Sequence, residues 1–251
     1  MKRALVTGAS RGIGSALAKR LAKRGYEVWV AGRNPATLEM EVGEIETAGG
    51  RAHAFVLDVS RPEEAEERVR ALDAEVGGLD LVIANAGIGG RTLPVAEQTL
   101  AQARTIFETN VMGALATLLP VIPGMVARGS GHIVGVSSLA GEMPLPAAAD
   151  YGTSKAALSF FLESAAMDLI PRGVLVTDVR PGFVRTELTA KNQFKMPFLV
   201  ELKDAAEIID RGIERGRRIV RFPMPLTTAI TASRLLPTVL RNRIVNAKRP
   251  V

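Results

Sequence analysis

Tyr151 and Lys155 are four residues apart in the segment DYGTSKAALSFF, residues 150–161, which otherwise reads as a buried helix. Side chains four positions apart share one face of a helix, so the hydroxyl and the ammonium should point the same way. A free tyrosine has a pKa of about 10, and a nearby cation lowers it by roughly 1 to 3 units. The pair therefore predicts a tyrosine that acts as a general acid or base near neutral pH.

Two further polar residues can join this pair. Ser138 lies thirteen residues before Tyr151, at the end of a predicted strand, and its hydroxyl can polarise a substrate carbonyl. Ligands bind at the carboxyl ends of the strands in open α/β sheets, which favours this position. Asn110 lies within an apolar helical segment, where an amide without a partner would cost about 1 to 3 kcal/mol. We therefore expect Asn110 to have a polar partner inside the fold.

A glycine-rich stretch follows the first predicted strand. Gly8, Gly12 and Gly14 stand in the segment TGASRGIGSALAKRLAKRG and lead directly into a helix. Glycines let the backbone approach a pyrophosphate closely, and the free N–H groups of a helix N-terminus attract it. An ordinary tight turn would also use glycines, but the position after an opening strand favours a dinucleotide site.

The elements that must position these residues alternate along the chain. Short runs of Val, Ile and Ala alternate with longer segments of helical period, which indicates repeated βα units and a parallel sheet. Right-handed crossovers then give an α/β, Rossmann-type, doubly wound parallel sheet with helices on both faces, in a single domain over residues 1–251. One predicted helix contains Pro120 and Pro123 and should kink or end there. The strands are predicted at 3–7, 27–32, 51–59, 79–87, 131–138, 174–182 and 217–222, and the helices at 13–24, 35–48, 61–76, 100–128, 150–170 and 204–215.

Composition excludes several other kinds of site. The chain of 251 residues has no cysteine, so it has no disulfide, no thiolate nucleophile and no Cys-based zinc site. His53 and His132 lie on predicted strands without metal-ligand partners and are interpreted as structural, so no metal site is predicted. The formal net charge is +6, but acidic and basic residues cluster in separate segments and aromatic residues make up 4%, which argues against a nucleic-acid partner.

The sequence predicts neither a targeting segment nor a membrane span. The N-terminus runs straight into a strand pattern and contains no signal-peptide core. No uninterrupted apolar run reaches the roughly 18 residues needed to span a bilayer, and the longest C-terminal candidate is broken by Arg234 and Pro237. We therefore expect a soluble, cytoplasmic protein.

The motifs T-G-x-x-x-G-x-G and Y-x-x-x-K resemble those of the short-chain dehydrogenase/reductase family, and the similarity runs from about residue 7 to residue 186. The resemblance implies an oxidoreductase that interconverts a carbonyl and a secondary alcohol with a nicotinamide cofactor. It implies that Ser138 binds the carbonyl and that Tyr151 transfers the proton. Lys155 would hold the nicotinamide ribose and lower the tyrosine pKa, and Asn110 would hold a water of the proton relay. The thirteen-residue spacing selects Ser138 over Ser137.

The cofactor preference is read from the end of the second predicted strand. Family members that use NAD normally carry an acidic residue there, and this chain has Arg33. Arg11 lies within the glycine loop, so two guanidiniums can bind a 2′-phosphate, and NADP(H) is predicted over NAD(H). The alternative is that both arginines are merely solvated. Besides Tyr151 and Lys155, the resemblance implies cofactor contacts at Gly8, Ser10, Arg11, Gly12, Ile13, Gly14, Arg33, Asp58, Val59, Asn85, Ala86, Gly87, Pro181, Gly182 and Thr186.

The substrate region and the C-terminal tail are less determined. The loop after Ser138 and a lid at about 187–202 carry apolar residues, which suggests a lipophilic carbonyl or alcohol. The tail, about 223–251, lacks the terminal I-T-G-Q stretch of family members that act on carrier proteins, which argues against that substrate and against their tetramer. A homo-oligomer, dimer or tetramer, is still expected. The tail can cover the active site, form a dimer interface or rest on a membrane surface, but packing within the protein is favoured. The apolar lid residues are Met143, Leu145, Phe194, Met196 and Phe198.

Two other functions remain as alternatives. A catalytically silent NADP-sensing regulator would keep the fold but typically loses the tyrosine or the lysine, and this chain has both. A sugar-nucleotide epimerase has a related set of catalytic residues, but usually a different glycine spacing and a longer substrate region. The sequence therefore favours the redox enzyme.

Overall fold

Seven parallel strands form the central sheet of the computed structural model, which describes residues 1–90, 92–191 and 196–239. The strand order is β3-β2-β1-β4-β5-β6-β7, so the chain crosses over at β1 and β4 and the predicted doubly wound α/β sheet is confirmed. The strands are β1 Arg3–Thr7, β2 Glu27–Gly32, β3 Arg51–Val56, β4 Leu81–Ala84, β5 Gly131–Val136, β6 Val174–Pro181 and β7 Ile219–Phe222.

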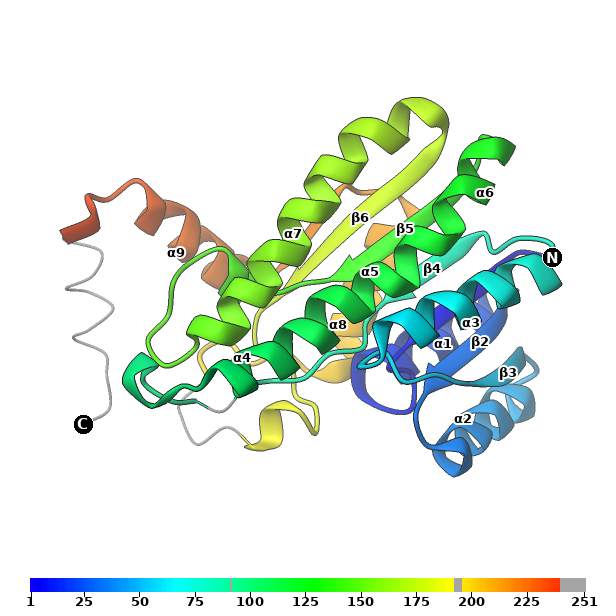
Figure 1. The fold of residues 1–251 in the computed structure, drawn as a ribbon, viewed down its shortest axis with the longest axis horizontal. Helices are drawn as coiled ribbons and strands as arrows, with labels where there is room; N and C mark the ends of the chain where they lie inside the picture. Colours follow the sequence, from blue (N-terminus) through cyan, green and yellow to red (C-terminus); the bar gives the residue numbers. More distant parts are fainter. Residues whose placement is uncertain (91, 192–195, 240–251) are drawn as a thin grey trace.

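Helices cover both faces of this sheet (Figure 1). Successive residues of a strand point to opposite faces, and β1 shows the consequence: Ala4 and Val6 pack into one hydrophobic core, and Leu5 packs into the other. Helices α1, α2 and α8 contribute to the first core, and α3, α5 and α7 to the second. The helices are α1 Gly12–Lys23, α2 Pro35–Thr47, α3 Pro62–Glu75, α4 Leu100–Phe107, α5 Gly113–Leu118, α6 Ile122–Arg128, α7 Ala149–Leu169, α8 Leu202–Glu214 and α9 Met224–Arg234.

Several strands end earlier than the sequence predicts. β3 ends at Val56 and β5 at Val136, two or three residues before the predicted ends. The residues that follow are polar and bond to loops instead of to the next strand: Asp58 accepts from Ser60, and Ser138 accepts from Ala140. These early endings leave polar side chains at the carboxyl edge of the sheet, where the predicted site lies.

The predicted helix at 100–128 is one helical segment with two irregular turns. A π-helical turn, Glu108–Met112, joins α4 to α5, and a 3₁₀ turn, Leu119–Val121, joins α5 to α6. Pro120 falls in the 3₁₀ turn, so the helix tightens there and continues instead of ending.

The same segment corrects the expectation about membrane spans. By length and composition, Leu100–Arg128 is apolar enough to cross a bilayer, although charged residues interrupt its apolar runs. In the structure 50% of its most apolar window is buried. Leu118, Val121 and Met125 are fully buried in the core beneath α3 and α7, which is the arrangement of a core helix.

The tail contains a helix that the sequence analysis did not predict. α9 follows β7 directly, and its Thr227 and Ile230 are buried. A Cβ on Gly182 would lie 2.9 Å from Leu226 Cδ2, so α9 packs closely on the turn after β6. The first part of the tail thus packs within the protein, as favoured, and residues 240–251 lie outside the described part.

Candidate active site

Tyr151 and Lys155 lie on successive turns at the start of α7. Lys155 is buried, and its Nζ donates to the Val136 carbonyl oxygen at 2.8 Å. Nζ lies 5.9 Å from the centre of the Tyr151 ring, so the two side chains share one face of the helix as predicted. The bond to Val136 ties the lysine to the end of β5, beside the predicted serine.

Ser138 meets Tyr151 at the end of β5. The Ser138 side chain lies close enough to the Tyr151 hydroxyl to oppose the rise in its pKa. Ser138 also caps the short 3₁₀ turn Leu139–Gly141: its Oγ accepts from Ala140 N at 3.1 Å, and Oγ donates to the Pro181 carbonyl oxygen at 3.4 Å. Two hydroxyl groups and one ammonium thus converge at the carboxyl edge of the sheet.

The electrostatics of this cluster differ from the prediction in one respect. Burial raises the pKa of Tyr151, and the nearby Ser138 side chain opposes that change only in part. The predicted lowering of this pKa is therefore wrong as far as the protein's own groups determine it. Burial lowers the pKa of Lys155 to about 8, and the negative charge of Asp178 acts in the opposite direction. The tyrosine is therefore a neutral proton donor at pH 7, and the lysine is mostly protonated.

Asn110 occupies the π-helical turn between α4 and α5 and is completely buried. Its Oδ1 accepts from Ile88 N at 2.8 Å, and its Nδ2 donates to the Ile88 carbonyl oxygen at 3.0 Å and to Ser154 Oγ at 3.1 Å. The amide therefore has the partners that the sequence required, and it fixes the loop after β4 to α7. The wider π turn lets the side chain leave the helix toward this loop.

Gly87 explains how Asn110 and Lys155 come close together. A Cβ added to Gly87 would lie 3.1 Å from Asn110 Oδ1 and 3.3 Å from Lys155 Nζ. A larger residue would wedge between the loop and these two groups. The glycine thus lets the backbone after β4 approach Lys155.

The glycine loop has the shape that a dinucleotide phosphate needs. Gly8 and Gly12 have positive φ angles of 64° and 58°. A Cβ on Gly8 would lie 2.8 Å from Ala86 Cα, and a Cβ on Gly14 would lie 2.3 Å from the Gly8 carbonyl oxygen. The N-cap of α1, Arg11, makes no side-chain cap hydrogen bond, so the first N–H groups of the helix receive no side-chain cap from that residue. These features fit a nicotinamide dinucleotide.

Asn85 serves this loop as a structural link. Its Nδ2 donates to the carbonyl oxygens of Thr7 at 2.9 Å and Gly8 at 3.2 Å. Thr7 Oγ1 in turn accepts from the backbone N–H groups of Asn85 and Ala86. These bonds hold the ends of β1 and β4 together at the point where the strand order reverses.

Arg33 lies beyond the end of β2 and is exposed. The residue before it, Gly32, lies close to Ser10 of the glycine loop, because a Cβ on Gly32 would be 3.7 Å from Ser10 Oγ. Burial raises the pKa of Asp58, but hydrogen bonds from Ser60 and the positive charges of Arg33 and Arg61 outweigh it, and the pKa is lowered. Arg33 and Ser10 therefore lie together where the adenosine ribose of a dinucleotide is expected, with the charged Asp58 near by.

Arg11 is placed differently from Arg33. Its Nη1 pairs with Glu187 Oε2 at 2.8 Å, and both side chains are exposed. Thr186 lies beside the glycine loop, because a Cβ on Gly12 would be 3.7 Å from Thr186 Cγ2. Thr186, which is predicted to contact the cofactor, therefore lies next to the glycine loop, whereas Arg11 points to the lid.

The other residues that were predicted to contact the cofactor are held in place by core packing and by a backbone hydrogen bond. Ile13 packs against the first core, and Val59 is buried in the second. Gly182 N donates to the Phe222 carbonyl oxygen at 2.8 Å, which holds the turn after Pro181 against β7.

The substrate side opens next to α7. A cavity of about 180 Å³ is lined by Gly89, Gly90, Leu93, Gln98, Gln102, Thr105, Ile106 and Asp150. A parallel bridge between Val184 and Val200 closes the base of the lid. Of the predicted apolar lid residues, Leu145 and Phe198 are exposed, and Phe194 lies outside the described residues.

Comparison with known proteins decides the family. The sequence model described as short chain dehydrogenase matches residues 2–196. The chain belongs to the short-chain dehydrogenase/reductase family. It is 50% identical over 237 residues to an uncharacterized oxidoreductase of Myxococcus xanthus, a match that covers 94% of this chain and 93% of that protein. It is 32% identical over 235 residues to the ketoacyl reductase HetN of Nostoc sp., covering 92% of this chain and 82% of that protein.

A solved structure shows the same fold. The short-chain dehydrogenase of Sphingobium yanoikuyae, in complex with NADPH, matches with a TM-score of 0.83 and 24% identity, covering 100% of this chain and 98% of that one. The present short-chain dehydrogenase/reductase is an oxidoreductase that acts on CH–OH groups.

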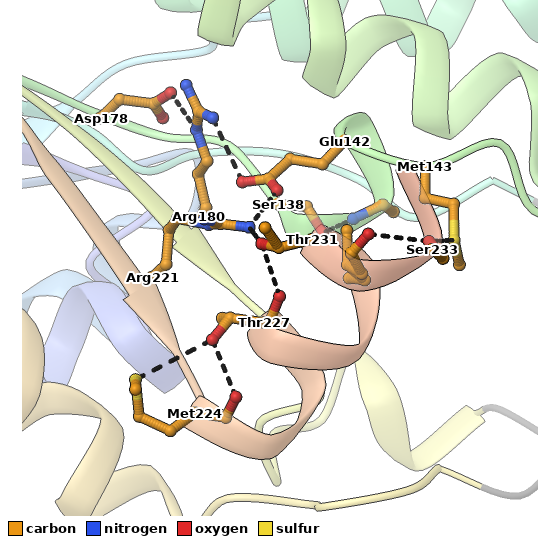
Figure 2. A network of polar contacts seen from close by, with 12 residues as sticks. Ser138, Glu142, Met143, Asp178, Arg180, Arg221, Met224, Thr227, Thr231 and Ser233 are labelled. Carbon is orange, nitrogen blue, oxygen red and sulfur yellow. Dashed lines mark hydrogen bonds and ion pairs between the residues drawn. The ribbon is translucent and has the colours of Figure 1, made fainter. Parts of the chain in front are cut away.

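Sequence reasoning missed a buried ionic cluster behind the active site of this short-chain dehydrogenase/reductase. Arg180 Nε donates to Asp178 Oδ2 at 2.6 Å, Nη1 to Glu142 Oε1 at 3.1 Å, and Nη2 pairs with Glu163 (Figure 2). Asp178 also accepts from Ser137 Oγ. The signal was two charged residues at alternate positions of an apolar strand, since Asp178 and Arg180 lie on the same face of β6.

Proposed function

We propose that this short-chain dehydrogenase/reductase is an NADP(H)-dependent enzyme that interconverts a lipophilic carbonyl compound and the corresponding secondary alcohol. The observation that carries the proposal is the placement of the Tyr151 hydroxyl beside Ser138, with Lys155 on the same face of α7. These groups lie at the carboxyl ends of β5 and β6, next to a glycine loop that fits a dinucleotide.

The protein groups supply the proton chemistry. A bound NADPH supplies a hydride to the carbonyl carbon. Ser138 Oγ donates to the carbonyl oxygen and orients it, and the Tyr151 hydroxyl gives its proton to that oxygen as negative charge develops there. Because burial raises the pKa of Tyr151, the hydroxyl is protonated at neutral pH and ready to donate. The Lys155 ammonium favours the phenolate that remains.

The choice of NADP(H) rests on Arg33. Its exposed guanidinium stands after β2, beside Ser10, where an acid would repel a 2′-phosphate. The similar fold of the NADPH-bound short-chain dehydrogenase supports a nicotinamide cofactor here. Arg11 adds a second positive charge to the same region once its exposed pair with Glu187 exchanges.

The lipophilic substrate is proposed from the residues beside Ser138. Met143 and Leu145 follow the catalytic serine, and Leu93 and Ile106 line the neighbouring cavity. The same cavity also has polar lining residues, Gln98, Gln102, Thr105 and Asp150, so its wall is only partly apolar. The apolar part of that wall favours the carbon skeleton of a ketone, and the negative charge of Asp150 disfavours a phosphorylated substrate.

Replacement of Tyr151 by Phe tests the proposed chemistry. We expect the variant to lose about 10²-fold or more of the wild-type rate, because only the transferable proton is removed. The rate is followed by NADPH absorbance with a panel of ketones, and NADPH affinity is followed by fluorescence titration. Affinity should stay near the wild-type value, and a variant that keeps more than about a tenth of the activity would refute the role of Tyr151.

A further inference from the structure

Glu142 is a buried carboxylate four residues after the catalytic serine. Its side chain is 4% exposed, and both of its oxygens are occupied. Oε1 pairs with Arg180 Nη1 at 3.1 Å, and Oε2 pairs with Arg221 Nη2 at 2.6 Å. Glu142 thus joins the loop after Ser138 to two neighbouring strands, β6 and β7.

The Arg180 side of this contact reaches the catalytic strand. Arg180 binds Asp178, and Asp178 accepts from Ser137, the residue before Ser138. Ser138 Oγ itself donates to the carbonyl oxygen of Pro181, the residue after Arg180. The cluster therefore fixes the end of β5 from one side and the loop after it from the other.

The Arg221 side reaches α9. Arg221 Nη2 also donates to Thr231 Oγ1 at 3.2 Å, and Ser233 Oγ donates to Met143 Sδ at 3.3 Å (Figure 2). Thr231 and Ser233 lie on the same helix, two residues apart. α9 therefore contacts the substrate loop at two successive residues, Glu142 through Arg221 and Met143 directly.

We propose that Glu142 is a positioning residue, which holds the loop 139–148 between β6 and α9 and thereby sets the position of Ser138 and of the substrate wall. The proposal rests on the function proposed above. Buried ion pairs seldom add net stability over apolar packing, so geometric constraint is the better-supported role of this cluster. Met143 and Leu145 follow Glu142 directly, so α9 sets how close they come to the reacting carbonyl.

Two carboxylates of the cluster provide a matched comparison. Glu142 and Glu163 both pair with Arg180, but Glu163 lies on α7 with its side chain 48% exposed and has no contact with the substrate loop. Glu142→Gln and Glu163→Gln each remove one negative charge beside the same guanidinium. Only Glu142→Gln also loosens the loop from α9.

The kinetic test uses both variants with a small and a bulky ketone. We expect Glu142→Gln to lower kcat/KM for the bulky ketone by about tenfold or more, with a smaller effect on the small one and with NADPH affinity unchanged. Glu163→Gln should stay within about twofold of wild type for both ketones. Equal losses in the two variants, or no loss in Glu142→Gln, would overturn the proposal.

A second measurement does not depend on enzyme activity. Hydrogen exchange of residues 139–148 should become faster in Glu142→Gln. It should also become faster in Arg221→Gln, because the partly exposed Arg221 side chain holds the other oxygen of Glu142. It should not change in Glu163→Gln. If Glu142→Gln and Arg221→Gln are folded and the exchange of residues 139–148 is unchanged in both, the positioning role is overturned. If the wild type reduces no ketone, the proposed function fails, and the exchange data still decide whether Glu142 holds the loop.

Discussion

Arg33 is the single residue on which the cofactor choice depends most. Its guanidinium is exposed after β2, whereas Arg11 is engaged by Glu187 on the lid. Exposed ion pairs contribute about 0 to 1 kcal/mol, so the Arg11 pair can exchange for a phosphate at little cost. In the described part of the chain no carboxylate forms an ion pair with Arg33 within 4.0 Å, although its charge acts on Asp58.

Replacement of Arg33 by Asp should move the preference toward NAD. The change removes an attraction to the 2′-phosphate and adds a repulsion, so we expect the NADP/NAD ratio of kcat/KM to fall by on the order of a hundredfold, less at high salt. Arg172→Asp is the matched control, because Arg172 is an equally exposed arginine beyond the far end of α7. A wild type that uses both cofactors equally, or an unaltered ratio in Arg33→Asp, would refute this role.

Local spacing was sufficient to predict that the residues of the candidate site lie close together. Tyr151 and Lys155 fall on one helix face, and Ser138 follows shortly after the end of β5, so period and position alone bring them together. The pKa of Tyr151 was not predictable, because it depends on burial that the sequence does not state. The contact of Glu142 with Arg180 and Arg221 joins residues 38 and 79 positions apart, and no local pattern encodes such a pairing.

Among the elements, α9 is the one whose role the sequence left open. The strands and the longer helices were predicted because each repeats its apolar period over many residues. α9 is short and begins with a proline in its first turn, and only Thr227 and Ile230 of its side chains are buried. Two buried positions are too few to establish a helical period, so the contact of this helix with β7 and the substrate loop became visible only in the structure.

Replacement of Ile230 by Asp should detach α9 from the protein. Ile230 is 4% exposed, and an unpaired carboxylate in that environment is strongly unfavourable, so we expect a lower Tm and a higher KM for bulky ketones. Leu235→Asp is the control, because Leu235 lies at the end of the same helix and is 85% exposed. Truncation after Pro223 should reproduce the Ile230→Asp kinetics while NADPH affinity persists. A truncated enzyme with unchanged KM would show that α9 does not shape the substrate site.

At the scale of the whole molecule, the polar groups of the candidate site are buried along with the hydrophobic cores on the two faces of the sheet. Lys155 is a residue of α7 with 5% of its surface exposed, and the fold must keep this ammonium largely out of water. The Val136 carbonyl and the charge of Asp178 offset only part of that cost, since the pKa of Lys155 still falls to about 8. Lys155 is therefore expected to reduce the stability of the entire domain at neutral pH.

The dependence of stability on pH tests this expectation. The folded protein releases the Lys155 proton near pH 8, whereas the unfolded chain releases it near the ordinary lysine pKa of about 10.4. Between these values the unfolded state binds more protons, so the free energy of unfolding should rise with pH, by about 3 kcal/mol in total from this group. Below pH 8 both states are protonated, and the full penalty applies. The raised pKa of Tyr151 gives the opposite slope only above about pH 10.

Comparison of the wild type with Lys155→Met isolates this contribution. Methionine has a similar length and no charge, and every other titrating group is retained, so the difference between the two unfolding free energies reports mainly on Lys155. Urea unfolding across about pH 7 to 10.5 should show a wild-type curve that rises more steeply than that of the variant. The loss of the bond to Val136 shifts the variant curve by a constant and does not change its slope. Parallel curves would mean that Lys155 titrates in the folded protein as it does in water, and that its burial does not lower the free energy of unfolding.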